Sequence, residues 1–174
     1  MTDACPLYAF RPMTEADLPL VLDWIARAHV REWWPEDPEI EAELRDGLRA
    51  PYMRYFLLTA DGEPFAFLQA YDIWREFEID AHAQWSGFYR DLAPPGSVGV
   101  DQFIGPEEMV GRGHGAAAIR LLVDHLLAEG APRVVTDPSP DNERAIRAYE
   151  KAGFRPLEAR PTPDGPALIM VRDR

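Results

Sequence analysis

Three glycines at alternate positions, Gly111, Gly113 and Gly115, mark the stretch of this 174-residue sequence best suited to chemistry. They lie between a predicted strand at residues 97–104 and a predicted helix that ends at Gly130. A glycine-rich backbone that opens into a helix exposes unpaired N–H groups at the positive end of the helix dipole. The stretch therefore predicts a site for an anionic, phosphate-bearing ligand.

The spacing of the glycines leaves three phosphate ligands to compare. A P-loop is excluded because no Gly-Lys-Ser/Thr follows. Gly111, Gly113 and Ala116 fit the dinucleotide pattern Gly-x-Gly-x-x-Ala, and Asp137 lies at a tolerable distance. However, residues 105–108 separate the strand from the glycines, and too little chain remains for the other half of a dinucleotide fold. These features disfavour a dinucleotide. The pyrophosphate of coenzyme A is the third ligand to compare.

Composition indicates one globular domain spanning residues 1–174, with 47% hydrophobic and 28% charged residues. The net charge of -12 disfavours nucleic-acid binding and is compatible with a cationic substrate. Cys5 is the single cysteine, which excludes an intrachain disulfide and a multi-cysteine metal site. No secretory leader or membrane-spanning run is evident, so we expect a cytoplasmic protein without membrane partners.

The sequence predicts a mixture of strands and helices. Thr14 and Asp17 have the spacing of a capping box for the first helix, which we expect residues 32–35 to interrupt. Asp61-Gly62 predicts a hairpin turn, and Ser139 with Pro140 predicts a helix start. Residues 74–96 are predicted to be a long insertion that covers a site. The strands are predicted at residues 7–13, 53–59, 64–73, 97–104, 133–136, 154–158 and 167–172, with helices after Thr14, at 39–50, after the glycines and from Ser139 to Ala152.

Several blocks in this order resemble the GCN5-related N-acetyltransferase (GNAT) family, and more narrowly its bacterial aminoglycoside 6'-N-acetyltransferases. The resemblance implies an α/β fold with a central mixed β-sheet flanked by helices. It also implies acetyl-CoA as the cofactor and a cationic amine, such as an aminoglycoside, as the acceptor. The matching blocks are Glu32-Trp33-Trp34, Gly99-Val100-Asp101-Gln102, Gly111 to Gly115, Thr136 to Phe154 and Pro163-Asp164-Gly165-Pro166.

The resemblance assigns the catalytic roles to two residues. Asp101 is expected to accept the proton of the attacking amine as general base, with ammonium binding or turn capping as its alternative. Tyr149 is expected to donate a proton to the departing thiolate, with core packing as its alternative. Trp85 lies in the divergent insertion and receives no role.

Cofactor binding is expected to rely mainly on backbone N–H groups. Those of Gln102, Phe103 and Ile104 are assigned to the acetyl and pantetheine arm. Asn142 is assigned to the cofactor, with helix capping as its alternative. The pyrophosphate is assigned to Gly111, Arg112, Gly113, His114, Gly115 and Ala116, with Ala145 also in the cofactor site.

The acceptor site is expected to combine aromatic and acidic walls. Asp137 is assigned to substrate binding, with capping of the following helix as its alternative. The four histidines have no metal-ligand spacing, so we expect no metal site. The substrate-binding residues are Trp34, Gln69, Tyr71, Asp101, Asp137 and Asp164.

Two other functions remain open at this point. Ile104-Gly105-Pro106 followed by the glycine run also resembles acyltransferases that modify hydroxylated lysines in siderophore synthesis, although those tend to carry His at the position of Asp101. A non-catalytic acyl-CoA sensor is the other alternative. The protein is expected to be a monomer or homodimer.

Overall fold

The computed structural model of the protein describes residues 6–34, 37–75, 90–162 and 165–174. The predictions for Asp164, Trp85 and most of the 74–96 insertion therefore lie outside the described residues. In the described part of the chain, no helix is long and apolar enough to cross a membrane.

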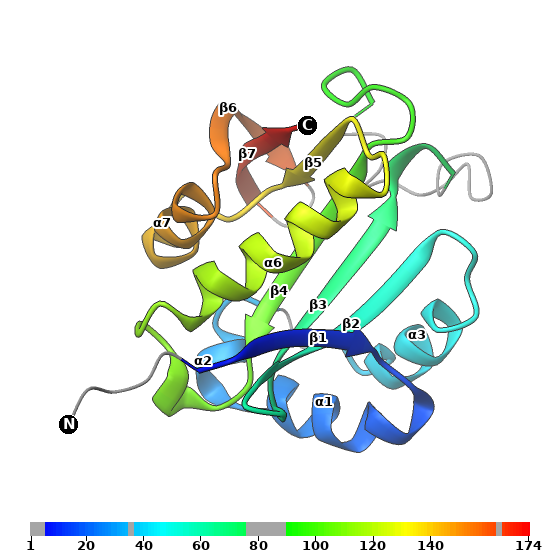
Figure 1. The fold of residues 1–174 in the computed structure, drawn as a ribbon, viewed down its shortest axis with the longest axis vertical. Helices are drawn as coiled ribbons and strands as arrows, with labels where there is room; N and C mark the ends of the chain where they lie inside the picture. Colours follow the sequence, from blue (N-terminus) through cyan, green and yellow to red (C-terminus); the bar gives the residue numbers. More distant parts are fainter. Residues whose placement is uncertain (1–5, 35–36, 76–89, 163–164) are drawn as a thin grey trace.

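The described strands form one mixed, seven-stranded sheet in the order β1-β2-β3-β4-β5-β7-β6 (Figure 1). Among them, only β4 and β5 pair in parallel, and the long helix α6 (His114–Ala128) makes the crossover that a parallel pair requires. This arrangement confirms the predicted fold class. The strands are β1 (Tyr8–Pro12), β2 (Met53–Ala60), β3 (Glu63–Asp72), β4 (Val98–Ile104), β5 (Arg133–Thr136), β6 (Arg155–Thr162) and β7 (Gly165–Asp173).

Helices cover both faces of the sheet. Figure 1 shows α6 crossing one face, and its side chains Ile119, Leu122, Val123 and Leu126 are buried. The opposite face is covered by α1 (Leu18–Ile25), α2 (Ala28–Arg31) and α3 (Ile40–Gly47), whose buried side chains pack against Tyr55, Leu57 and Phe67. Side chains alternate between these two layers along each strand.

The central strands β4 and β5 separate almost as soon as they pair. Their register joins Val98 to Val134 and Gly99 to Val135, and no later pair follows among the described residues. Beyond this point β4 continues to Ile104 with β3 as its neighbour. A gap therefore opens on the β5 side of β4.

The register also determines which backbone groups of β4 face this gap. Ile73 N donates to Ser97 O at 3.2 Å and Gly105 N donates to Phe65 O at 2.9 Å, so odd-numbered residues of β4 bond to β3. Because these bonds alternate along an antiparallel pair, the N–H groups of Gln102 and Ile104 face away from β3. They point toward the gap.

The start of the first helical region differs from the prediction in detail. Thr14 and Asp17 form the predicted capping box, but the first turn is a 3-10 helix at Glu15–Asp17. Helix α2 ends at Arg31, as the predicted interruption from residue 32 requires, but an additional break at Arg27 was not predicted. Arg27 is extended and donates to Gly105 O at 3.1 Å, and His29 Nε2 lies 2.9 Å from Ile104 O. These contacts fasten α2 to the end of β4.

The predicted start of the last helix is also wrong. Helix α7 (Glu143–Lys151) begins three residues later than Ser139 and Pro140 indicated. Asn142 is the N-cap, because its Oδ1 accepts from Ala145 N at 3.1 Å. Ser139 instead closes the preceding turn, where its carbonyl accepts from Asn142 N.

Other element boundaries shift without changing the topology. The predicted helix at residues 39–50 is shorter, and the closing strands β6 and β7 are longer than predicted. The hairpin turn is confirmed, because Asp61 and Gly62 have φ angles of 52° and 90°.

We expect Asp17→Asn to lower the free energy of unfolding by about 1 kcal/mol. Asp17 accepts from Arg11, at 2.6 and 2.8 Å, and from Thr14, and these bonds hold the pKa of its carboxyl far below the usual range. A depressed native pKa stabilises the fold above the unfolded pKa, so the difference from wild type should shrink as the pH falls below about 4. Urea unfolding at several pH values measures this difference.

Asp23→Asn is the matched control, because Asp23 is exposed and pairs only with Arg27 in the described structure. An equal loss of stability in both variants would contradict the capping role of Asp17.

Candidate active site

A cleft of about 1060 Å³ opens where β4 and β5 separate. Its walls come from α2 and the chain after it, β3, β4, the glycine loop, the first turn of α6, the end of β5, α7 and β7. The cleft therefore gathers residues that are far apart in the sequence. The predicted site residues that line it are Trp34, Gln69, Tyr71, Asp101, Gln102, Phe103, Ile104, Gly111, Gly113, Gly115, Ala116, Asp137, Asn142, Ala145 and Tyr149.

Asp101 lies on the face of β4 that α1 to α3 cover, directly opposite Gln69 of β3. Gln69 Nε2 donates to Asp101 Oδ2 at 2.8 Å. Burial raises the pKa of Asp101, and the bond from Gln69 opposes that rise. The result is an oriented carboxyl group with increased basicity, which suits proton transfer.

Tyr149 both packs in the core and lines the cleft. Its side chain is buried, with its ring edge-to-face against Phe154 at 5.3 Å. Burial and the nearby charges of Asp101 and Asp137 raise its pKa, against the effect of a hydrogen bond with Thr136. The hydroxyl therefore remains protonated and can serve as a donor beside Asp101.

The glycine loop has a backbone that other residues rarely adopt. Gly111 and Gly113 have φ angles of 75° and 90°, and Gly113 is the N-cap of α6. No side chain in the described structure caps this helix, so the N–H groups of its first turn are available to a ligand. This geometry fits an anion.

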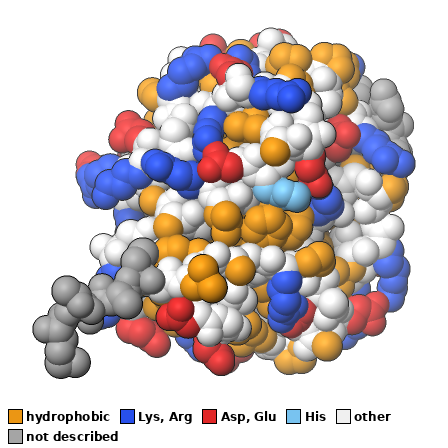
Figure 2. All heavy atoms as spheres, in the orientation of Figure 1, with side chains coloured by type: hydrophobic (Ala, Val, Ile, Leu, Met, Phe, Trp, Pro, Cys, Tyr) orange, Lys and Arg blue, Asp and Glu red, His pale blue; other side chains and the backbone are white. Residues whose placement is uncertain are grey.

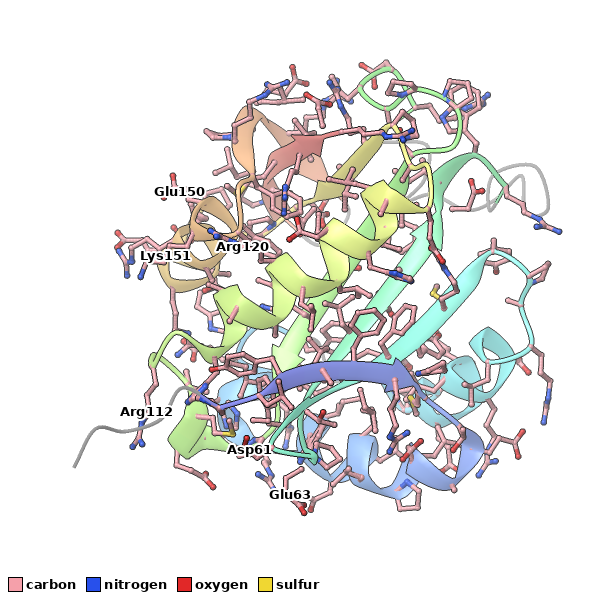
Figure 3. All side chains as sticks on the ribbon, viewed as in Figure 1. Asp61, Glu63, Arg112, Arg120, Glu150 and Lys151 are labelled. Atoms are coloured by element: carbon pink, nitrogen blue, oxygen red, sulfur yellow. The ribbon has the colours of Figure 1, made fainter. Side chains whose placement is uncertain are left out.

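The side chains of Arg112 and His114 do not line the cleft. His114 Nδ1 lies 2.6 Å from the hydroxyl of Tyr8, and its ring packs against Tyr8 and Phe65. Arg112 is exposed, and Figure 3 shows it pointing from the loop into solvent. Neither of these two predicted cofactor side chains is therefore part of the cleft lining in this structure.

Gln102 carries the clearest sign of a missing partner. Its Oε1 is buried and accepts no hydrogen bond from any residue that the structure describes. The amide lies beside the first turn of α6, with Nε2 3.7 Å from the position of a Cβ on Gly115. Because a buried, unsatisfied carbonyl is costly, we expect a ligand to bond to it.

Phe103 forms part of the wall and contributes no backbone donor to the gap. Its main chain faces β3, and its ring packs against Phe67 and Trp34, each at 5.2 Å. Tyr71 also lines the cleft, and its ring occupies the space above Gly99, where a Cβ would lie 2.2 Å away. A side chain at position 99 would therefore displace the ring of Tyr71 from the wall of the cleft.

Sequence reasoning missed an acidic set on the acceptor side. Burial, followed by the charge of Asp37, raises the pKa of Glu43. The signal available in the sequence was the run of acids just after Trp33-Trp34. The missed acids that line the cleft are Glu32, Asp37 and Glu43.

A basic set on α7 was also missed. Arg144, Arg147 and Lys151 line the cleft from the same helix as Asn142 and Ala145. Their spacing of three and four residues places them along one side of the helix. The cleft thus has acids toward α2 and α3 and cations along α7, beyond the glycine loop.

Comparison with known proteins agrees with this geometry. Residues 13–161 match the family model of the acetyltransferase (GNAT) domain. The aminoglycoside N(6')-acetyltransferase type 1 of Klebsiella pneumoniae is 33% identical over 182 residues, covering 100% of this chain and 87% of the relative. A kanamycin resistance protein of Rhizobium radiobacter is 42% identical over 88 residues, covering 50% of this chain and 82% of the relative.

Solved structures of aminoglycoside acetyltransferases also resemble this chain. The aminoglycoside acetyltransferase AAC(6')-Ib in complex with coenzyme A superposes with a TM-score of 0.83 at 32% identity, covering 97% of this chain and 95% of that one. Its complex with coenzyme A and kanamycin superposes with a TM-score of 0.81, with the same identity and coverage. The chain therefore belongs to the GCN5-related N-acetyltransferase family.

Proposed function

We propose that this protein transfers the acetyl group of acetyl-CoA to the 6'-amine of an aminoglycoside. The observation that carries the proposal is the cleft itself, in which a half-buried carboxyl bonded to Gln69 lies between an acidic wall and an uncapped helix start. The names and bound ligands of the relatives support the same substrates.

The residues present fit coenzyme A. Gly111 and Gly113 leave the backbone at the start of α6 with little side-chain cover, which suits a pyrophosphate. The unpartnered Oε1 of Gln102 suits an amide N–H of the pantetheine arm, and the N–H groups of Gln102 and Ile104 face the same gap. Bound there, acetyl-CoA supplies an activated thioester.

The chain's own residues then handle the protons. An aliphatic amine titrates near pH 10 and reaches the site as a cation, which the acids of the cleft attract. Asp101, oriented by Gln69, takes one proton from the ammonium, which frees the nitrogen lone pair to attack the thioester carbon. The nitrogen loses its second proton to solvent as the amide forms. The backbone N–H groups of Gln102 and Ile104 stabilise the negative charge on the thioester oxygen. Tyr149 donates its proton to the departing thiolate sulfur.

The siderophore-type alternative loses its main support in the structure. The ring of Trp24 packs on Gly105, where a Cβ would lie 2.1 Å from it. Packing therefore explains the glycine of Ile104-Gly105-Pro106 without reference to the acceptor. The acids of the cleft favour a polycationic acceptor.

Asp101→Asn should lower kcat with kanamycin by about 100-fold or more, because the base is lost. The affinity for coenzyme A should stay within about twofold, since Asp101 lies away from the glycine loop. Thiol release with kanamycin, ribostamycin and N6-hydroxylysine gives kcat, and calorimetry gives the affinity. Unchanged turnover would remove Asp101 as the base, faster turnover of hydroxylysine would favour the siderophore alternative, and tight binding without turnover of any amine would favour the sensor.

Gln69→Leu should move the acidic limb of the kcat/KM profile to higher pH. The bond from Gln69 favours the charged form of Asp101, so its loss raises the pKa of that carboxyl further. The base is then protonated over a wider pH range. An acidic limb at the wild-type position would show that Asp101 is not the group whose titration limits turnover.

Gln102→Leu should weaken coenzyme A binding three- to tenfold, roughly the value of one hydrogen bond. The free energy of unfolding should stay equal or rise, because an unsatisfied buried amide is replaced by an apolar side chain. Calorimetry and urea unfolding measure the two effects. The two leucine variants are matched controls, since only Gln69→Leu should move the pH profile and only Gln102→Leu should weaken binding.

A further inference from the structure

His29 lines the cleft but takes no part in the proton transfers described for Asp101 and Tyr149. It lies half-buried in α2, and its Nε2 is 2.9 Å from the carbonyl oxygen of Ile104 at the end of β4. Because a carbonyl oxygen only accepts hydrogen bonds, Nε2 carries a proton and donates it to this bond. That donor exists in one neutral tautomer of the ring and in the charged ring, so the bond does not require a particular charge on His29.

The bond from His29 takes the place of a neighbouring strand. The N–H and C=O groups of one strand residue point in the same direction. Since the N–H of Ile104 faces the gap beside β4, its carbonyl faces that gap as well. Strand β5 pairs with β4 at Val98 and Gly99, and in the described part of the chain this pairing does not reach Ile104. His29 therefore supplies a donor that a longer pairing with β5 would supply.

Contact with α6 fixes the position of Ile104 but not the direction of its main-chain groups. Its Cδ1 lies 3.3 Å from the position of a Cβ on Gly115. In Figure 2, which views the molecule from the α6 side, apolar side chains gather near the middle of the face with charged side chains around them. Apolar packing is non-directional, whereas a hydrogen bond has a preferred angle. The orientation of Ile104 in the gap therefore depends on the bond from His29.

The same bond changes the charge that a ligand meets in the gap. The N–H groups of Gln102 and Ile104 are the proposed donors to the thioester oxygen, whose negative charge grows in the transition state. A carbonyl oxygen of the protein beside them carries partial negative charge, which opposes this stabilisation in a site shielded from water. Donation from His29 offsets that charge. The bond thus orients the end of β4 and also reduces a repulsion.

We propose that His29 is a positioning residue for acyl transfer, because it holds the end of β4 with the N–H of Ile104 directed at the thioester oxygen. The inference rests on the use of these N–H groups in the proposed function, and it does not depend on which amine accepts the acetyl group. His29 acts through Ile104 on a charge that develops only in the transition state. Its loss should therefore appear in kcat and not in acetyl-CoA binding.

Arg27 provides a matched control at the same junction. Its Nη1 donates to Gly105 O at 3.1 Å, so it also fastens α2 to the end of β4. The N–H of Gly105 donates to Phe65 O at 2.9 Å, on the side of β4 that faces β3. Arg27→Met therefore loosens α2 without removing a bond to a group that faces the gap.

His29→Leu should lower kcat with kanamycin by about 10- to 100-fold, the range expected when one donor to the thioester oxygen is misplaced. The KM for acetyl-CoA should stay within about twofold. His29→Gln should retain most of the rate, because its Nε2 can donate to the same carbonyl without a titrating ring. Arg27→Met should keep kcat near the wild-type value. Urea unfolding verifies that each variant is folded.

Infrared spectroscopy tests the same bond without an acceptor. Acetyl-CoA that is isotope-labelled at the thioester carbonyl should show a lower C=O stretching frequency when bound to the wild-type protein, because N–H donors weaken that double bond. His29→Leu should lose much of this shift. His29→Gln and Arg27→Met should keep it.

The outcomes separate this inference from the proposed function. A shift that survives in His29→Leu, or an equal loss of kcat in His29→Leu and Arg27→Met, would overturn the inference while acetylation of kanamycin stands. A loss of kcat in His29→Gln equal to that in His29→Leu would also overturn it, since the imidazole itself would then be the active group. The absence of any shift in the wild-type protein would reject both the inference and the role of the β4 N–H groups. The expected pattern of shifts without turnover of kanamycin would support the inference and refute the proposed acceptor.

Discussion

The early separation of β4 from β5 is the constraint on which the site depends. Two residue pairs join the strands, and β4 then runs on beside β3 alone. In a fully paired sheet, the N–H groups of Gln102 and Ile104 would bond to the neighbouring strand. Here they face a cleft. The same separation brings the helix starts of α6 and α7 to one opening, because each follows one of the two strands.

Once the gap exists, alternation along β4 divides the chemistry between the two faces of the sheet. Asp101 points to the α1–α3 side, where it meets Gln69 and the acidic wall. Gln102 points to the other side, beside the first turn of α6. A one-residue shift of register would exchange these environments, so the pairing of β3 with β4 is itself a functional feature.

Local patterns in the sequence predicted much of this correctly. The Asp61-Gly62 hairpin, the capping box of Thr14 and Asp17 and the glycine loop each depend on nearby residues, and the structure contains all three. Features set by distant contacts were missed. Arg27 interrupts the first helix because it and His29 bond to the end of β4, and no local signal marks that contact.

The start of α7 was predicted wrongly for a second reason, namely that two residues near it are both suitable as N-cap. Ser139 and Asn142 both suit a helix start, and the longer turn after β5 selects Asn142. For the site, the glycine run predicted the open start of α6 but not the direction of the side chains beside it. His114 and Arg112 point away from the cleft, whereas Glu43 and Lys151 face it, and these directions depend on packing across the sheet.

The contact between Tyr8 and His114 gives the first strand an influence on a site that it never enters. This hydrogen bond spans 106 positions of the sequence and joins an edge strand to the first residue of α6. The orientation of the first turn of α6 thus depends in part on β1, a strand at the edge of the sheet. Because this bond fixes the first residue of α6, the packing of β1 against that helix is coupled to the orientation of the glycine loop.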